Sequence, residues 1–373
     1  MDTVSYNTNC KDYQICSLFA QSLTEVASVF IARHTPSKTL VAYKRYDVDQ
    51  LSAEDARLVQ DEAVLMRQLN HPAILPLLSS FVADHKVVCI LPLMGYGSSA
   101  DVLLRHFSTG LPEQAIATII KTVLQALVYL HSKGIIHRAV RGSHVLISAE
   151  GNVVLTGLRY ACPVISAGRW QKKMHSYPAS IMAPNVNWLS PELLKQNVEG
   201  YDERSDIYSV GITACELANG IAPYQGVEKT LMLIEKVQGI PRPLMDSSTY
   251  IPRGPIDGDA TEGDMCQDDD DYSAIIRNRT FSNSFHHATE LCLEMHDHLR
   301  PHAKDLLTHS FFKNAPPPAA LPRLLYPAMP ILQDSLPDNQ EDLDSLMVSE
   351  KIRLFLSPQP LMNYQIRHLP TCL

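Results

Sequence analysis

Basic side chains stand in three short segments, and their types suit the binding of phosphate. Lys44 lies in KTLVAYK, while Arg141 and His144 lie in HRAVRGSHVLI, and Arg159 closes LTGLR. Arginine keeps its charge at any relevant pH, and its guanidinium forks onto phosphate oxygens. The chemistry within reach of these residues is therefore the neutralisation of an anionic ligand, if the fold brings the segments together.

Cysteine chemistry is not indicated. The eight cysteines are scattered without a CxxC pair, so neither a zinc ribbon nor a redox motif is visible. We expect free thiols. The sequon Asn278-Arg279-Thr280 is interpreted as a chance match, because glycosylation requires a secreted chain.

Composition excludes several classes of protein. The chain has 373 residues, 45% hydrophobic and 19% charged, with a net charge of -8. This length predicts two domains or one two-lobed domain with a sizeable core. An acidic chain without a basic stretch argues against nucleic acid or an anionic membrane as a partner. No apolar run reaches the roughly 18 to 20 residues that span a bilayer, and the first residues do not resemble a signal peptide. The expected location is the cytoplasm or the nucleus.

The first hundred residues read as a β-rich unit. Residues 14–45 alternate apolar and polar in short runs around a Thr-Pro-Ser turn, which predicts a β-hairpin. Helical spacing follows over 53–70, ended by His-Pro. Two further strands are expected at 73–82 and 86–91. The small residues at 95–99 indicate a hinge.

The rest of the chain reads as a helical unit. Apolar residues on one face predict a long buried helix over 112–132, and short strands are expected at 134–137, 145–148 and 153–156. Residues 206–219 are apolar nearly all round, as a helix inside a lobe would be, and Gly220 is placed to end it.

Two segments have unusual composition. Within the insert 246–272, residues 257–271 contain eight of the chain's 40 acidic residues and no basic residue, and these eight negative charges equal the whole net charge of -8. We interpret it as a solvated loop. The tail, 314–373, holds ten of the 25 prolines, and we interpret it as a linker or a partner-binding segment rather than regularly packed structure.

In order and spacing, the motifs resemble those of the protein kinase family. VAYK resembles the third-strand lysine motif, HRAVRGSHVLI the catalytic loop, WLSPELL the APE segment, and SDIYSVGI and LRPHAKDLLTHSFF the helices that anchor it. The resemblance implies an α+β, two-lobed fold: an N-terminal segment 1–15, a small β-rich N-lobe at about 16–93 and a larger helical C-lobe at about 98–313. It implies an ion pair between Lys44 and Glu62.

The residues that transfer phosphate in kinases are missing. In the glycine-rich loop Ser22, Thr24 and Ala27 replace three glycines. Ala139 replaces the catalytic Asp, a loss worth roughly 10²–10⁴ in rate. His144 replaces one metal-binding residue, and Gly157-Leu158-Arg159 replaces the metal-binding DFG motif, although hard cations require oxygen ligands. We expect a pseudokinase with no catalytic residue and no metal site.

The replacements suggest a nucleotide site without metal. By the resemblance Arg141, His144 and Arg159 face the triphosphate beside Lys44, so that cationic side chains replace Mg²⁺ and ATP is bound but not hydrolysed. The predicted nucleotide-binding residues are Lys44, Glu62, Val29, Ala42, Leu91, Met94, Arg141, His144 and Arg159. A second set is expected to hold the activation segment and the lobe in shape: Arg138, Pro191, Glu192, Asp206 and Arg300, the last paired with Glu192.

Longer stretches are similar to one family, the sterile-twenty-related kinase adaptors. They include MGYGSSADVL, SHVLIS, LTGLR, SDIYSVGITACELANG and RTFSNSFHHATELCL. The resemblance implies an ATP-binding adaptor that activates the Ser/Thr kinase liver kinase B together with an armadillo-type scaffold and holds it in the cytoplasm. Such chains typically end in a Trp-Glu-Phe that docks on the scaffold. Here the scaffold contact is expected on the lobes or on tail residues such as Leu354-Phe355-Leu356.

Two alternatives stay open. The first is a slow Ser/Thr kinase with an unconventional base, which the retained Lys44 marginally favours. The second is a pure scaffold whose nucleotide cleft holds no ATP.

Overall fold

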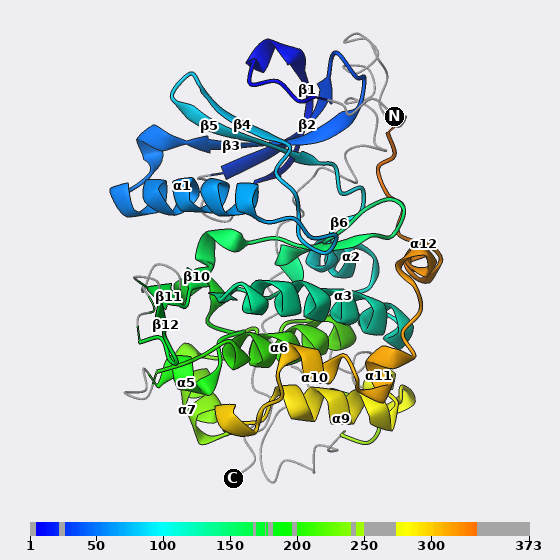
Figure 1. Ribbon diagram of the computed structural model, residues 1–373. Coiled ribbons are helices and arrows are strands. Elements are labelled where there is room, and N and C mark those ends of the chain that lie inside the picture. The colour runs from blue at the N-terminus through cyan, green and yellow to red at the C-terminus, as the bar shows by residue number, and fades with distance from the viewer. Residues whose placement is uncertain are drawn as a thin grey trace, which may run out of the picture.

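The computed structural model describes most of the chain. The described ranges are 5–21, 27–166, 169–175, 177, 182–195, 200–239, 244–249 and 274–333. They contain two lobes, one above the other in Figure 1. The α+β, two-lobed fold expected from the sequence is confirmed.

The N-lobe is one antiparallel sheet of five strands in the order β1-β2-β3-β5-β4. The strands are β1 (Tyr13–Gln21), β2 (Ala27–His34), β3 (Leu40–Asp47), β4 (Ser79–Ala83) and β5 (Lys86–Pro92). The predicted turn falls between β2 and β3. Residues 14–45 thus form three strands rather than one hairpin, and the run expected over 73–82 is a strand only at its end.

Helix α1 (Ala53–Gln68) lies beside this sheet. It starts at Ser52, whose side chain accepts a hydrogen bond from the amide of Asp55 and so satisfies one unpaired helical donor. Its buried positions, Val59, Glu62 and Met66, recur every three or four residues. One buried face therefore carries both core contacts and the Glu62 carboxylate.

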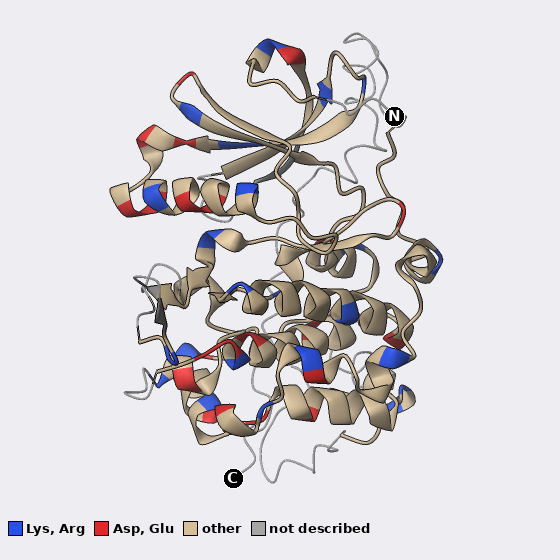
Figure 2. Ribbon diagram, viewed as in Figure 1, with Lys and Arg blue, Asp and Glu red and all other residues tan. Residues whose placement is uncertain are grey.

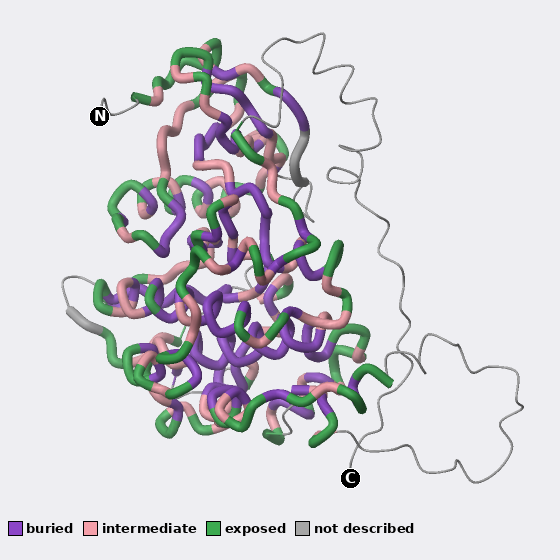
Figure 3. Tube along the Cα trace, turned by 90° about the vertical axis from the view of Figure 1, so that its right-hand side faces the viewer, coloured by how far each residue is buried: buried purple, intermediate pink, exposed green. Residues whose placement is uncertain are grey.

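The C-lobe is built on two buried helices, α3 (Glu113–Ser132) and α6 (Arg204–Asn219), which contact each other. By length and composition α3 is apolar enough to cross a membrane, but 67% of that window is buried inside the domain. Figure 3 shows the buried residues concentrated in the interior of the fold, with exposed residues at its periphery. Further C-lobe helices are α2 (Ser99–His106), α5 (Pro191–Leu194), α7 (Lys229–Gln238), α9 (Asn283–Cys292), α10 (Ala303–Leu306) and α11 (Ser310–Lys313).

Short strands and 3-10 turns form the segments that follow the hinge and the helix α3. One sheet has the order β6-β8-β9, and two further pairs are β7 with β10 and β11 with β12. Their bounds are β6 (Gly97–Ser98), β7 (Ile135–Ile136), β8 (Val145–Ile147), β9 (Val153–Leu155), β10 (Cys162–Pro163), β11 (Ile165–Ser166) and β12 (Arg169–Trp170). Two 3-10 turns, η3 (Gly142–His144) and η4 (Leu158–Tyr160), hold the segments in which the sequence departs from active kinases.

The packed part of the chain extends beyond residue 313. Residues 314–333, assigned to the tail from their prolines, include the turn η7 (Pro318–Ala320) and helix α12 (Leu321–Leu324). Leu321, Leu325 and Ala328 are buried in the main core. These apolar side chains hold residues 321–328 against the C-lobe, although the proline content of the segment indicated a linker. Residues 334–373, with Leu354-Phe355-Leu356, and most of the acidic insert, 250–273, lie outside the described residues.

Candidate nucleotide cleft and activation segment

Lys44 and Glu62 form the predicted ion pair. The Lys44 Nζ on β3 lies 3.7 Å from Oε2 of Glu62 on α1. The Tyr46 hydroxyl donates to the same oxygen at 2.8 Å. Burial by itself would lower the pKa of Lys44, but the Glu62 carboxylate and Tyr46 outweigh it and raise that pKa. Lys44 is therefore held as a cation in the position that binds phosphate in kinases.

The four apolar residues predicted to line the cleft come together. Ala42, Leu91 and Met94 belong to the main hydrophobic cluster, and Val29 packs against it. Ala42 lies opposite Leu91 in the pairing of β3 with β5, and Val29 lies opposite Lys44 in the pairing of β2 with β3. Residues from both lobes belong to this cluster. The apolar wall and the Lys44 cation are thus neighbours.

Little of the glycine-rich loop is described. Ser22 and Thr24 lie outside the described residues, whereas Ala27 begins β2 and is buried.

Ala139 occupies the position of the catalytic base and is 1% exposed. Its amide donates to His137 Nδ1 at 3.2 Å, and its carbonyl accepts a hydrogen bond from His144 Nδ1 at 2.7 Å. A methyl group cannot take a proton from a substrate hydroxyl. The residue therefore shapes the loop and supplies no acid–base chemistry.

His144 is a neutral imidazole. Because its Nδ1 donates to Ala139, its Nε2 is left to accept from Arg141 Nη2 at 3.2 Å. Burial, and then the charge of Arg141, lower the pKa of His144 well below its ordinary value. The expectation that His144 supplies positive charge is therefore wrong. Its role in this structure is to orient Arg141.

Arg141 joins the catalytic loop to the activation segment. Its Nη1 donates to the carbonyl of Pro184 at 2.8 Å, and its guanidinium lies 5.7 Å from the ring centroid of Trp188. Its Nε is buried and has no hydrogen-bond acceptor among the described residues. One donor of this guanidinium thus remains unused beside the cleft segments.

Arg159 is paired with a carboxylate of α1. Its Nη2 donates to Asp55 Oδ1 at 2.5 Å, and the side chains of Arg159 and Asp55 are 17% and 34% exposed. The turn η4 that carries Arg159 contacts α1 and lies beneath it in Figure 2. The expectation that Arg159 faces the triphosphate is thus not met in this conformation. The partner that balances the charge of Arg159 is Asp55, in the first turn of α1.

The residues predicted to hold the activation segment do so. The two oxygens of buried Asp206 accept the amides of His137 and Arg138, each at 2.8 Å. Arg138 has a positive φ of 63°, and its Nε donates to the Tyr160 carbonyl at 2.6 Å. Burial by itself would raise the pKa of Asp206, but the hydrogen bond and charge of His131 and the charge and amide of His137 outweigh it and lower that pKa.

Glu192 and Arg300 are paired as predicted. Two Arg300 nitrogens reach the Glu192 carboxylate at 2.8 and 3.3 Å, and the Ser205 hydroxyl donates to it at 2.8 Å. Pro191 begins α5, where a missing amide hydrogen costs nothing. This network fixes the end of the activation segment.

Sequence reasoning missed Lys236 of α7. Its buried Nζ donates to the carbonyls of Val186, Asn187 and Leu189, at 3.3, 2.6 and 2.8 Å. Burial lowers its pKa well below the ordinary value. Nothing in the local sequence marks this lysine, because its partners are main-chain groups. Tyr46 and Asp55 were also missed, because only the fold brings them to the side chains of Glu62 and Arg159.

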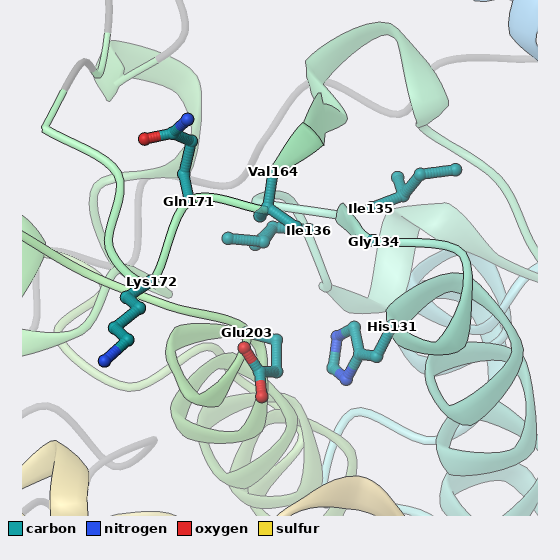
Figure 4. A pocket seen from close by; sticks show the side chains of 8 residues that line it. All are labelled: His131, Gly134, Ile135, Ile136, Val164, Gln171, Lys172 and Glu203. Carbon is teal, nitrogen blue, oxygen red and sulfur yellow. The ribbon is translucent and has the colours of Figure 1, made fainter. Parts of the chain in front are cut away.

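A cavity of about 270 Å³ lies under the activation segment (Figure 4). It is lined by His131, Gly134, Ile135, Ile136, Val164, Gln171, Lys172 and Glu203. Within the described ranges, no group of three or more His, Cys, Asp or Glu side chains is arranged to hold a metal ion. The six cysteines found there are free thiols, as expected.

Comparisons with known proteins agree with these motifs. The family described as "Protein kinase domain" matches residues 25–312. The chain is 38% identical over 333 residues to "STE20-related kinase adapter protein alpha" of Homo sapiens, covering 86% of this chain and 77% of that protein. It is 39% identical over 334 residues to the alpha protein of Bos taurus, covering 86% of this chain and 89% of that protein. It is 33% identical over 320 residues to "STE20-related kinase adapter protein beta" of Homo sapiens, covering 82% of this chain and 76% of that protein. The chain therefore carries a protein kinase domain and belongs to the STE20-related kinase adapter family.

Proposed function

We propose that this chain is a catalytically inactive adaptor that binds ATP without a metal ion and without turnover. In this proposal it allosterically activates a partner Ser/Thr kinase of the liver kinase B type, with an armadillo-type helical-repeat scaffold. We also propose that the protein is located in the cytoplasm, with the nucleus as a second location. One observation carries the proposal: the Lys44–Glu62 pair of an active kinase is kept while Ala139 stands where the base belongs.

The loss of catalysis follows from the residues. Phosphoryl transfer depends on placing the γ-phosphate, metal ions and nucleophile together. Ala139 removes the base, and His144 and the Gly157-Leu158-Arg159 triplet remove the oxygen ligands of both metal ions.

The binding of ATP is supported by the cleft. Lys44 is a cation beside the apolar wall of Ala42, Leu91 and Met94. Arg141 carries a buried Nε without an acceptor among the described residues, and a phosphate oxygen would satisfy such a donor. ATP would supply negative charge and contacts to both lobes, which stabilises a closed arrangement by mass action.

An adaptor of this kind acts through its shape. The Arg138–Asp206 and Glu192–Arg300 contacts keep the base of the activation segment rigid. A partner kinase that binds this surface more tightly in its active conformation is shifted toward that conformation by the difference in affinity.

A nucleotide-free scaffold is the second candidate, and the Arg159–Asp55 pair favours it. An arginine that already has a carboxylate partner contributes less to phosphate binding. Slow kinase activity is the third candidate and has only the retained Lys44 in its favour.

Reconstitution tests the proposal. The partner kinase and scaffold are mixed with this chain, and partner activity is measured for wild type, Lys44→Met and Arg159→Ala. The exposed substitution Lys304→Met is the control. The adaptor proposal expects stoichiometric activation that Lys44→Met reduces and Lys304→Met does not. Activation that neither Lys44→Met nor Arg159→Ala changes supports the nucleotide-free scaffold, and no activation by wild type contradicts the adaptor role.

A further inference from the structure

The segment Pro316–Gln333, named the strap here, crosses from the C-lobe to the N-lobe outside the hinge (Figure 1). It is anchored on each lobe and on the hinge itself. The hinge at residues 95–99 is the first connection between the lobes, and these anchors make the strap a second one.

The C-lobe anchor is extensive. The Thr118 hydroxyl of α3 donates to the Pro316 carbonyl at 3.0 Å. Leu321 and Leu325 are fully buried in the main core. A Cβ at Gly151 would come within 2.3 Å of the Pro318 carbonyl oxygen, so the glycine permits this close packing. This end of the strap is thus part of the C-lobe.

The strap next contacts the hinge through main-chain atoms. The Ile331 amide donates to the Gly95 carbonyl at 2.9 Å. A Cβ on Gly95 would meet the Ile331 carbonyl oxygen at 2.4 Å, a distance that real Cβ contacts do not reach. The glycine in the hinge therefore makes room for the strap.

The last anchor is on β3, the strand that carries Lys44. The Gln333 amide bonds both main-chain groups of Leu40: its Oε1 accepts from the Leu40 amide at 2.6 Å, and its Nε2 donates to the Leu40 carbonyl at 3.3 Å. Ile331 also packs, with Leu93, on the cluster of Cys16, Ile31 and Leu40. The strap thereby reaches the start of the strand that positions Lys44.

We infer that the strap sets the angle between the lobes and, through it, the affinity for ATP. Lobe opening turns a kinase-like fold about a few hinge residues. Such a rotation moves Leu40 and Gly95 relative to the C-lobe, and it breaks the Gln333 and Ile331 contacts. Binding ATP across a cleft that is already held closed costs less than closing it. This regulation rests on the proposed nucleotide function, whereas the mechanical role does not.

Two variants release the strap in different ways. Gln333→Ala removes the Leu40 anchor without touching the core. Gly95→Ala pushes the strap from the hinge, and its backbone is outside the positive-φ region. Outside the strap, the new Cβ would meet the Ala149 Cβ at 3.2 Å, so this neighbour has to shift by a few tenths of an ångström, far less than the strap has to move. Met329→Ala, on the outward side of the strap at 61% exposure, is the matched control.

Hydrogen exchange and ATP titration in EDTA are measured on wild type, the two strap variants, the double variant Gln333→Ala/Gly95→Ala and the Met329→Ala control. We expect faster exchange in the first turn of α1 and in η4, remote from the strap, and about five-fold weaker ATP binding, as for the loss of one net hydrogen bond. The double variant is expected to match the single ones. Unchanged exchange in α1 and η4 for both variants overturns the strap's role. Faster exchange without ATP binding by any of the proteins supports the mechanical role and contradicts the proposed nucleotide function.

Discussion

Arg159 of η4 donates a 2.5 Å hydrogen bond to Asp55 in the first turn of α1. The pair joins the triplet that replaces the metal-binding motif to the helix that carries Glu62. A kinase keeps a carboxylate in that triplet to hold a metal ion; this chain places an arginine there and a carboxylate on the helix. The charge that would meet phosphate is thus balanced within the protein.

Removing Asp55 should release Arg159 toward the cleft. For Asp55→Asn we expect ATP binding in EDTA to tighten by up to about five-fold, because a partly exposed ion pair contributes up to roughly 1 kcal/mol. Isothermal titration measures the change. Asp61→Asn is the control, since it removes the same charge from the exposed face of the same helix. Weaker binding by Asp55→Asn than by Asp61→Asn would show that the pair assists the nucleotide rather than competing with it.

Breaking the buried Glu192–Arg300 pair should strongly lower the free energy of unfolding. Glu192→Gln leaves the Arg300 guanidinium, 0% exposed, without its counter-charge, and we expect the free energy of unfolding to fall by about 3–5 kcal/mol. Urea denaturation measures this. Glu203→Gln, which affects a half-exposed contact with His302, should change stability little. Equal losses for the two variants would contradict the structural role given to Arg300.

The neutral state of His144 predicts a pH dependence. A histidine whose pKa is lowered in the folded protein binds its proton more readily in the unfolded chain. Its stabilising contribution is therefore complete above the ordinary value near 6.5 and is lost as pH falls below it. His144→Asn, which restores the residue of active kinases, should make stability less sensitive to pH between 7 and 5.

Thermal unfolding of wild type and His144→Asn across this range tests the assignment. His298→Asn, at an exposed position, serves as the control. A pH profile of His144→Asn that is identical to wild type would mean that another group, such as buried His137, carries the dependence.

Slow Ser/Thr kinase activity, the third candidate function, is tested by phosphate incorporation. With labelled ATP and Mg²⁺ or Mn²⁺, we expect no phosphate incorporation above background, because Ala139 offers no base. Lys44→Ala is measured in parallel. Incorporation by wild type that disappears in Lys44→Ala would establish a slow kinase.

The sequence predicted what short motifs encode. The two lobes, the Lys44–Glu62 and Glu192–Arg300 pairs and the buried α3 and α6 follow from residues at fixed spacing in a familiar order. The direction of a side chain is set instead by what the fold brings beside it. Arg159 turned to Asp55 because α1 lies over η4, and His144 became neutral because burial and Arg141 disfavour a second charge.

The tail was hidden by composition. Its prolines indicated a linker, yet Leu321 and Leu325 pack in the core and Gln333 bonds to main-chain atoms of β3. A contact between a side-chain amide and backbone leaves no trace in the sequence pattern of its partner. The same holds for Lys236 and its three carbonyls.

Metal-free ATP binding is tested by a thermal-shift titration of the full chain with ATP in EDTA. We expect a concentration-dependent rise in Tm without metal that saturates with ATP, is lost in Lys44→Met and is kept in Lys304→Met. A wild-type Tm that stays constant in EDTA up to millimolar ATP would contradict metal-free nucleotide binding.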